Sequence, residues 1–161
     1  MQNPPQTPPE HPAARWERTP SWLLNQTAHH AQRLVADGFS SLNARGYHYR
    51  LLATLHDSGP ASQAELGRRS GIHVSDMVAT VNELTEAALV ERTPDPADRR
   101  RNIISLTTEG QHRLRRLEEQ LAATQDTLLA PLSPDERAHL TDLLATVLDH
   151  HEQHTRTRPP H

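Results

Sequence analysis

The apolar residues of this chain recur at spacings of three, four and seven through most of its 161 residues, as in amphipathic helices. The pattern predicts helices from Thr19 to about Leu42, from about Tyr47 to His56, from Ser62 to the residue before Gly71, from about Val74 to Ala88, from Thr108 to about Ala130, and from Ser133 onward. Gly59-Pro60 and Pro131 stop the second and fifth helices. Ser62 and Glu65 fit a capping box, in which each side chain accepts the other residue's backbone N–H.

The fourth predicted helix has two different faces. Val78, Val81, Leu84 and Ala88 recur at spacings that form one apolar stripe, which we expect to be buried. The other side carries short polar residues, which we expect to be exposed: Ser75, Asp76, Ala79, Thr80 and Glu83.

Two short apolar runs flank a charged turn near the middle of the chain. Residues 88–92 and 103–106 are predicted strands, and the sequence DPADRRRN at 95–102 joins them. Two short helices connected by a turn at residues 70–73 come just before this hairpin, in the order of a helix-turn-helix followed by a wing. The predicted fold class is mainly α with a small β-wing: a winged helix-turn-helix domain with additional helices at both ends.

These motifs resemble the MarR family of bacterial transcription regulators. The resemblance rests on SQAELGRRSGI at 62–72, on NELTEAALVERTPDPADRRRNIISLTTEG at 82–110, and on the order of the flanking helices, over roughly residues 20–152. It implies a homodimer held by the first and last helices. It also implies that two recognition helices and two wings meet a pseudo-palindromic DNA operator whose half-sites lie about one helical turn, roughly 10 bp, apart.

The resemblance further implies a repressor that a small, anionic and often phenolic ligand releases from DNA. The expected partners are therefore double-stranded DNA, a second copy of the chain and a small-molecule effector, with no membrane and no bound cofactor. One position departs from the family pattern. Family recognition helices often begin with Asp-Arg-Ser, whereas this chain has His73-Val74-Ser75 and so lacks a common cationic contact.

The expected organisation has four parts. Residues 1–18 form a proline-rich arm that cannot pack a core and is expected to be disordered, as is a tail at 155–161. Residues 19–46 and 108–154 form a helical dimerisation region. Residues 47–107 form the DNA-binding winged domain.

Composition excludes several function classes. The net charge of −3 argues against indiscriminate binding to nucleic acid, yet residues 92–116 hold seven Arg against three acidic residues, so attraction for phosphate is confined to one region. The chain has no cysteine, which excludes disulfides and thiolate zinc sites. No run of about 18 apolar residues is present, and we expect a cytoplasmic protein. No nucleophile–base set or phosphate-binding glycine loop is evident, so an enzyme is not expected.

The candidate DNA contacts lie on the wing and on the helix-turn-helix. Arg99, Arg100 and Arg101 occupy the wing tip, where a guanidinium can enter a minor groove, and Asp98 is expected to brace a neighbouring Arg. Arg100 best fits the family's Asp-x-Arg wing pattern. The remaining candidates are on or beside the two helices: Ser62, Gln63, His73, Ser75, Asp76 and Thr80. Asp76 repels phosphate unless it accepts from a cytosine amino group, and it is equally suited to the start of a helix.

The candidate ligand-binding residues lie on the first two helices, which in the family help line a crevice beside the winged domain. They are Arg18, Trp22, His29, His30, Tyr47 and His48. A cation beside an aromatic ring suits an aromatic carboxylate, because the cation pairs with the charge and the ring stacks. The alternative is that Trp22 belongs to the dimer core and that the histidines are polar groups of the interface.

Twelve histidines raise a second functional class, a zinc-responsive regulator. His150 and His154 are spaced four apart, and His29, His30, His48 and His56 could converge at a dimer interface. No HExxH motif or carboxylate at fixed spacing accompanies them, so scattered surface histidine is the favoured interpretation and no metal ligand is assigned.

Overall fold

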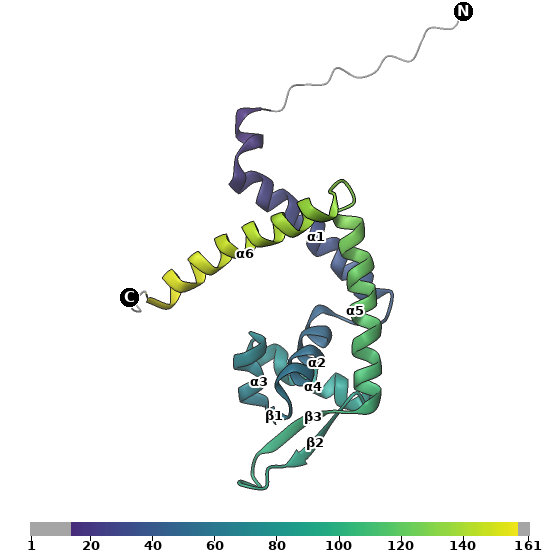
Figure 1. The fold of residues 1–161 in the computed structure, drawn as a ribbon. Helices are drawn as coiled ribbons and strands as arrows, with labels where there is room; N and C mark the ends of the chain where they lie inside the picture. The colour runs from purple at the N-terminus through teal and green to yellow at the C-terminus, as the bar shows by residue number, and fades with distance from the viewer. Residues whose placement is uncertain (1–13, 158–161) are drawn as a thin grey trace, which may run out of the picture.

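The computed structural model of the chain describes residues 14–157 (Figure 1). It contains a short 3₁₀ helix, η1 (Arg15–Arg18), six α-helices and three strands within that range: α1 (Pro20–Ser40), α2 (Gly46–Ser58), β1 (Ala61–Ser62), α3 (Gln63–Ser70), α4 (Val74–Glu86), β2 (Val90–Pro94), β3 (Asn102–Leu106), α5 (Thr108–Leu128) and α6 (Pro134–Thr157). The expected fold class, mainly helical with a small β-wing, is confirmed.

The elements form a compact winged domain and a helical arm (Figure 1). Helices α2, α3 and α4 lie together with the sheet at one end of the molecule. Helix α1 packs along α5, and together they lead away from the winged domain. Helix α6 projects from the far end of α5 and extends away from the other helices (Figure 1).

The sheet has three antiparallel strands in the order β1-β3-β2. Strands β2 and β3 form the wing hairpin, in which Val90 pairs with Leu106 and Pro94 pairs with Asn102. Strand β1, which was not predicted, pairs Ala61 with Ile104 and so covers the other edge of β3. The wing is therefore hydrogen-bonded to the residues that directly precede α3.

The core lies where α2, α3, α4, the sheet and the start of α5 meet. Its most deeply buried residues are mainly aliphatic: Leu51, Leu52, Leu66, Met77, Val81, Leu84, Val90, Ile104 and Leu117. Gly110, in the first turn of α5, lies so close to the sheet that a Cβ there would be 2.0 Å from the carbonyl oxygen of Leu89. Only glycine allows the first turn of α5 to lie against the residue that precedes β2.

The predicted faces of α4 were partly wrong. Val78, expected in the core, is 46% exposed, and Thr80, expected in solvent, is 1% exposed. The core stripe instead runs through Met77, Thr80, Val81 and Leu84. Thr80 can be buried because its hydroxyl donates to the carbonyl of Asp76 (2.7 Å), so no polar group is left without a hydrogen bond.

The ends of several elements also differ from the predictions. Helix α4 stops at Glu86, and Ala88 is an exposed residue with a left-handed backbone (φ 56°), so it belongs neither to the helix nor to the strand that begins at Val90. Arg15–Arg18 is helical rather than part of a disordered arm, and α6 continues to Thr157, past the predicted end at 154. Residues 1–13 and 158–161 lie outside the described range. None of the described helices is both long enough and apolar enough to span a membrane.

Candidate nucleic-acid interface and adjoining crevice

Local capping sets the geometry of the two helices of the helix-turn-helix. The Ser62 hydroxyl accepts from the backbone N–H of Glu65 (3.3 Å) and so caps α3. Gly71, with φ 64°, ends α3 in the left-handed region that glycine adopts without strain. The His73 ring then accepts from the backbone N–H of Ser75 (3.4 Å) and caps α4.

The solvent side of α4 carries mostly small side chains, two of which are valines. Val74 is 73% exposed and Val78 is 46% exposed, and Ser75, Ala79 and Asn82 are exposed around them. Residues 74–86 include three carboxylates, Asp76, Glu83 and Glu86, and no Lys or Arg. By itself this helix would not be attracted to a polyanion.

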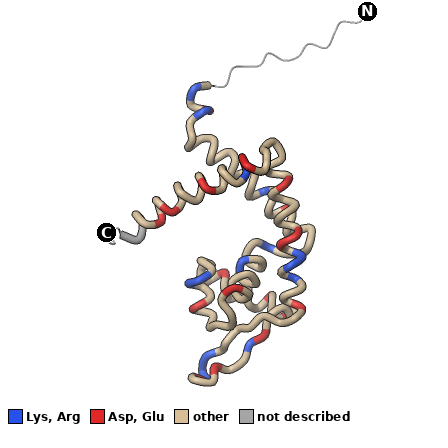
Figure 2. Tube along the Cα trace, viewed as in Figure 1, with Lys and Arg blue, Asp and Glu red and all other residues tan. Residues whose placement is uncertain are grey.

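Arginines on the neighbouring elements supply the missing positive charge (Figure 2). Arg68 and Arg69 on α3 both pair with Glu65, and their hydrogen bonds hold the pKa of that carboxyl below its ordinary value. Arg92 on β2 donates to the amide oxygen of Asn82 on α4. Figure 2 shows further basic residues at the wing tip. Cations therefore flank α4 although α4 has none.

The wing loop has a defined conformation. One carboxylate oxygen of Asp98 accepts from both the backbone N–H (3.1 Å) and the Nε (3.2 Å) of Arg100, whose side chain is 91% exposed. Arg101 reaches back and donates to the hydroxyl of Ser62 (3.3 Å). Arg99 is also exposed. Two of the three wing arginines thus point to solvent, and the third links the wing to the start of α3.

The remaining predicted DNA contacts differ in how far they are exposed to solvent. Ser62 is 9% exposed and its hydroxyl is already hydrogen-bonded within the protein, while Gln63 is half-buried. His73 and Ser75 are exposed, and Asp76 is half-buried. Buried Thr80 has no access to solvent, so it is no longer a candidate for a DNA contact.

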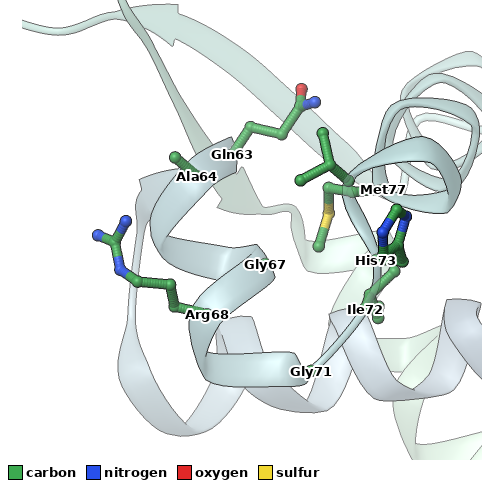
Figure 3. A pocket seen from close by; sticks show the side chains of 9 residues that line it. Gln63, Ala64, Gly67, Arg68, Gly71, Ile72, His73 and Met77 are labelled. Atoms are coloured by element: carbon green, nitrogen blue, oxygen red, sulfur yellow. The ribbon is translucent and has the colours of Figure 1, made fainter. Parts of the chain in front are cut away.

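A shallow groove of about 730 Å³ lies between α3 and the start of α4 (Figure 3). Gln63 and Gly67 on α3 and His73 and Met77 beside or on α4 line it, as Figure 3 shows. Val74 also lines this groove. The exposed apolar surface of α4 therefore continues onto α3.

A second hollow, of about 330 Å³, lies where α2, α4 and α5 meet, and we call it the crevice. Its lining includes His48 from α2, Glu83 from α4, and Arg113 and Arg116 from α5. Leu52, Leu84 and Leu89 give it an apolar wall. Arg113 donates to the backbone carbonyls of Leu42 and Asn43, and these hydrogen bonds hold its guanidinium group beside the loop that precedes α2.

Glu83 connects the crevice to the exposed helix. Nε2 of His48 lies 2.7 Å from a carboxylate oxygen of Glu83, and Arg45 donates to the same oxygen. The other ring nitrogen of His48 accepts from the backbone N–H of Arg45 (3.3 Å), so Nε2 carries the proton that His48 donates to Glu83. The hydrogen bond from His48, followed by that from Arg45, holds the pKa of Glu83 below its ordinary value.

Of the six predicted ligand-binding residues, only His48 lines the crevice. The others have separate surroundings. Trp22 packs edge-to-face on Trp16 (5.6 Å between centroids), and Arg18 is exposed in η1. His29 bonds to the carbonyl of Asn25, His30 to Arg33, and Arg50 lies over the ring of Tyr47.

Sequence reasoning missed Arg113 and Arg116. The sequence feature that could have indicated them is a pair of arginines three residues apart in the first half of a helix, each directly before a leucine of the buried stripe.

The histidine pattern does not form a metal site in the described part of the chain. Among residues 14–157, no group of three His, Asp or Glu side chains lies close enough together to hold a metal ion. The rings of His150 and His154 are 4.2 Å apart, as expected one helical turn apart, and Nδ1 of His154 lies 2.6 Å from the carbonyl oxygen of His150.

Comparisons with known proteins agree with this architecture. A sequence model described as the MarR family matches residues 40–101. The HTH-type transcriptional regulator PecS of Dickeya dadantii is 30% identical over 115 residues, which cover 70% of this chain and 69% of PecS. The HTH-type transcriptional repressor NicR of Pseudomonas putida is 32% identical over 101 residues, or 63% of this chain; the match spans 64% of NicR, just under two thirds of its length.

A solved structure extends the similarity over most of the fold. The PcaV transcriptional regulator of Streptomyces coelicolor, solved in complex with its natural ligand, is 29% identical with a TM-score of 0.69. The match covers 86% of this chain and 98% of that structure. It therefore includes both the winged domain and flanking helices.

Proposed function

Because this chain belongs to the MarR family of winged helix-turn-helix transcriptional regulators, which are not enzymes, we propose that it is a homodimeric DNA-binding repressor released by a small anionic aromatic ligand. One observation carries the proposal. Arg68 on α3 lines the groove beside Val74 of α4, Arg92 on β2 donates to Asn82 of α4, and the wing carries the exposed Arg99 and Arg100. This arrangement suits a helix that enters a major groove while its neighbours contact the phosphates on either side.

The helical arm supports the dimer. Leu143, Leu144, Val147 and Leu148 on α6 are each more than 40% exposed, and so are Leu23 and Leu24 on α1. An exposed row of apolar side chains such as the one on α6 is typical of an interface. A second copy would cover it and would place two winged domains on one DNA site, as a pseudo-palindromic operator requires.

The crevice is the proposed ligand site. Arg113 and Arg116 offer guanidinium groups to a carboxylate, and the leucines of the wall suit an aromatic ring. A relative with 29% identity, PcaV, has been solved with a natural ligand, which supports a small-molecule effector for this fold. We therefore place the effector at His48, Arg113 and Arg116 rather than at Arg18, Trp22, His29, His30 and Tyr47.

Release follows from competition for His48. A bound carboxylate beside His48 would compete with Glu83 for its N–H, and α4 would lose one of the two groups that fix Glu83. The ligand would then bind more tightly to a dimer in which α4 has moved, and it can shift the equilibrium only by that difference in affinity.

Two measurements test this function. Selection of duplexes from a random DNA pool, followed by footprinting on DNA near its own coding region, should give a two-fold symmetric site whose affinity falls steeply with salt. Calorimetry with benzoate and its hydroxylated derivatives should give one saturable site per subunit, and binding should weaken the DNA complex. Saturable zinc binding with no response to any aromatic acid would instead favour a metal-responsive regulator.

A further inference from the structure

We propose that Val74 and Val78 select DNA sequence by contacting the 5-methyl groups of thymines in the major groove. The proposal rests on the function proposed above and deepens it, because it names the side chains that distinguish one base pair from another.

The two valines are placed for such a contact. They lie one turn apart, which puts them on the same side of the first half of α4. Val74 is 73% exposed and Val78 is 46% exposed, although valine is among the residue types most often buried. The N-terminal residues of a recognition helix are those that reach base edges.

The rest of α4 offers few other means of reading bases. The commonest specific contact is a bidentate one from Arg or Lys to guanine, and residues 74–86 contain neither. Asn82 could read adenine, but its amide oxygen accepts from Arg92. Glu83 could accept from cytosine, but His48 and Arg45 hold its carboxylate. Ser75 and Asp76 offer only short polar contacts, and the base contact that Val74 and Val78 themselves can make is an aliphatic one with a thymine methyl.

Charge identifies DNA as the occupant of this apolar surface. Arg68 on α3 lines the groove beside Val74, Arg92 on β2 donates to Asn82 on α4, and Figure 2 shows further basic residues on the wing. A polyanion is attracted to these cations, whereas an apolar protein surface would take them out of water and offer no opposite charge in return. The groove beside Val74 extends the apolar surface towards α3 (Figure 3), so the neighbouring sugar and methyl groups also have somewhere to pack.

The test removes methyl groups from the DNA. The probe is the tightest duplex selected from a random pool, in which each thymine is replaced in turn by uracil; this removes only the methyl and keeps the pairing and the O4 acceptor. Wild-type protein should lose about fourfold in affinity for each methyl that a valine buries, and about fifteenfold when both half-sites are changed. Uracil outside the footprint is the control.

Protein variants assign the effect to the valines. Val74→Ala and Val78→Ala should bind the thymine duplex more weakly, and each should lose the sensitivity to uracil at its own position. Both side chains are exposed, so the variants should unfold at the same temperature as the wild type. If uracil has no effect within the footprint, or if both variants remain as sensitive as the wild type, the proposal is wrong although the DNA-binding function stands. If no duplex is enriched in the selection, the proposed function itself fails.

Discussion

Nε2 of His48 lies 2.7 Å from a carboxylate oxygen of Glu83, so a residue that lines the crevice is hydrogen-bonded to the helix that faces solvent beside the wing. The contact joins positions 35 residues apart in sequence. It is short, its carboxylate oxygen also accepts from Arg45, and it lies in the wall of the proposed ligand site, where α2 meets the helix proposed to contact DNA.

Glu83→Gln should weaken communication between the two sites. The amide keeps the shape and one acceptor oxygen but loses the charge that binds His48 and Arg45, so operator affinity without ligand should change by less than about threefold. The loss of affinity that an aromatic acid causes, which for allosteric coupling is about 5- to 150-fold, should shrink markedly. Fluorescence anisotropy with labelled operator measures both quantities. Glu86→Gln, one turn further along α4, is the matched control, and an equal ligand effect in all three proteins would contradict the mechanism.

Acid should weaken the same contact. The pKa of Glu83 is lowered in the folded state, so its ionised form stabilises the fold at pH values above the ordinary glutamate range. That contribution is lost as the pH falls through the lowered folded-state pKa, as the carboxylate takes up a proton. Urea unfolding between about pH 6 and about pH 3 should show a steeper loss of stability for the wild type than for Glu83→Gln. Parallel curves would show that the ion pair contributes nothing measurable.

Arg100→Ala should weaken operator binding by about tenfold, because one charge-assisted contact with DNA is lost. The slope of log affinity against log salt should fall by about 1, while the dimer remains intact. Nitrocellulose-filter or anisotropy titrations over a range of salt measure the slope. Arg15→Ala, in η1 at the opposite end of the molecule from the wing, is the control (Figure 1). A wild-type slope for Arg100→Ala would remove the wing from the DNA interface.

Gly110→Ala should destabilise the fold by about 3 kcal/mol and lower Tm by about 10 °C. The new Cβ would lie 2.0 Å from the Leu89 carbonyl oxygen and 2.7 Å from a methyl group of Leu106, so the backbone must shift where the first turn of α5 packs on the residue before β2. Gly46→Ala is the matched control, since a Cβ there has no neighbour within 4 Å and this variant should keep or slightly raise Tm. Equal melting temperatures for the two variants would contradict this packing.

Leu144→Glu should shift the protein from dimer to monomer, because it places a charge on the apolar surface of α6 that the second copy is proposed to cover. Light scattering after size-exclusion chromatography gives the mass directly. Asp149→Lys, on the opposite side of α6, should leave the dimer unchanged. A monomeric wild type, or a dimeric Leu144→Glu variant, would show that this surface has another role.

Local features of the sequence were sufficient to predict most of the helices and strands. The capping residues Ser62 and Gly71 predicted the bounds of α3 correctly, since each acts on its own segment. Strand β1 was missed because two residues after Gly59-Pro60 carry no local strand pattern. They become a strand only by pairing with Ile103 and Ile104, about 40 positions later.

Tertiary packing determined which face of α4 is buried and where the crevice lies, and local features of the sequence predict neither. Residues 74–86 offer two apolar stripes, one through Val74 and Val78 and one through Met77 and Val81, and periodicity alone does not say which faces the core. The crevice was missed for a related reason. Arg113 and Arg116 line the same hollow as His48 only because α5 packs against α2, an arrangement that no residue on α5 specifies by itself.

Two distances decide how the proposed dimer would fit DNA: the one from the wing to α4, and the one between the two copies of α4. The pairing of β1 with β3 and the Arg101–Ser62 hydrogen bond allow the two distances to change separately during evolution. They make the distance between the wing and α4 a property of a single subunit. The distance between two copies of α4 depends instead on how the helical arms pair. On the proposed function, substitutions on the exposed side of α4 could change which bases are preferred, and substitutions on α1 and α6 could change the spacing between half-sites, without either change requiring the other.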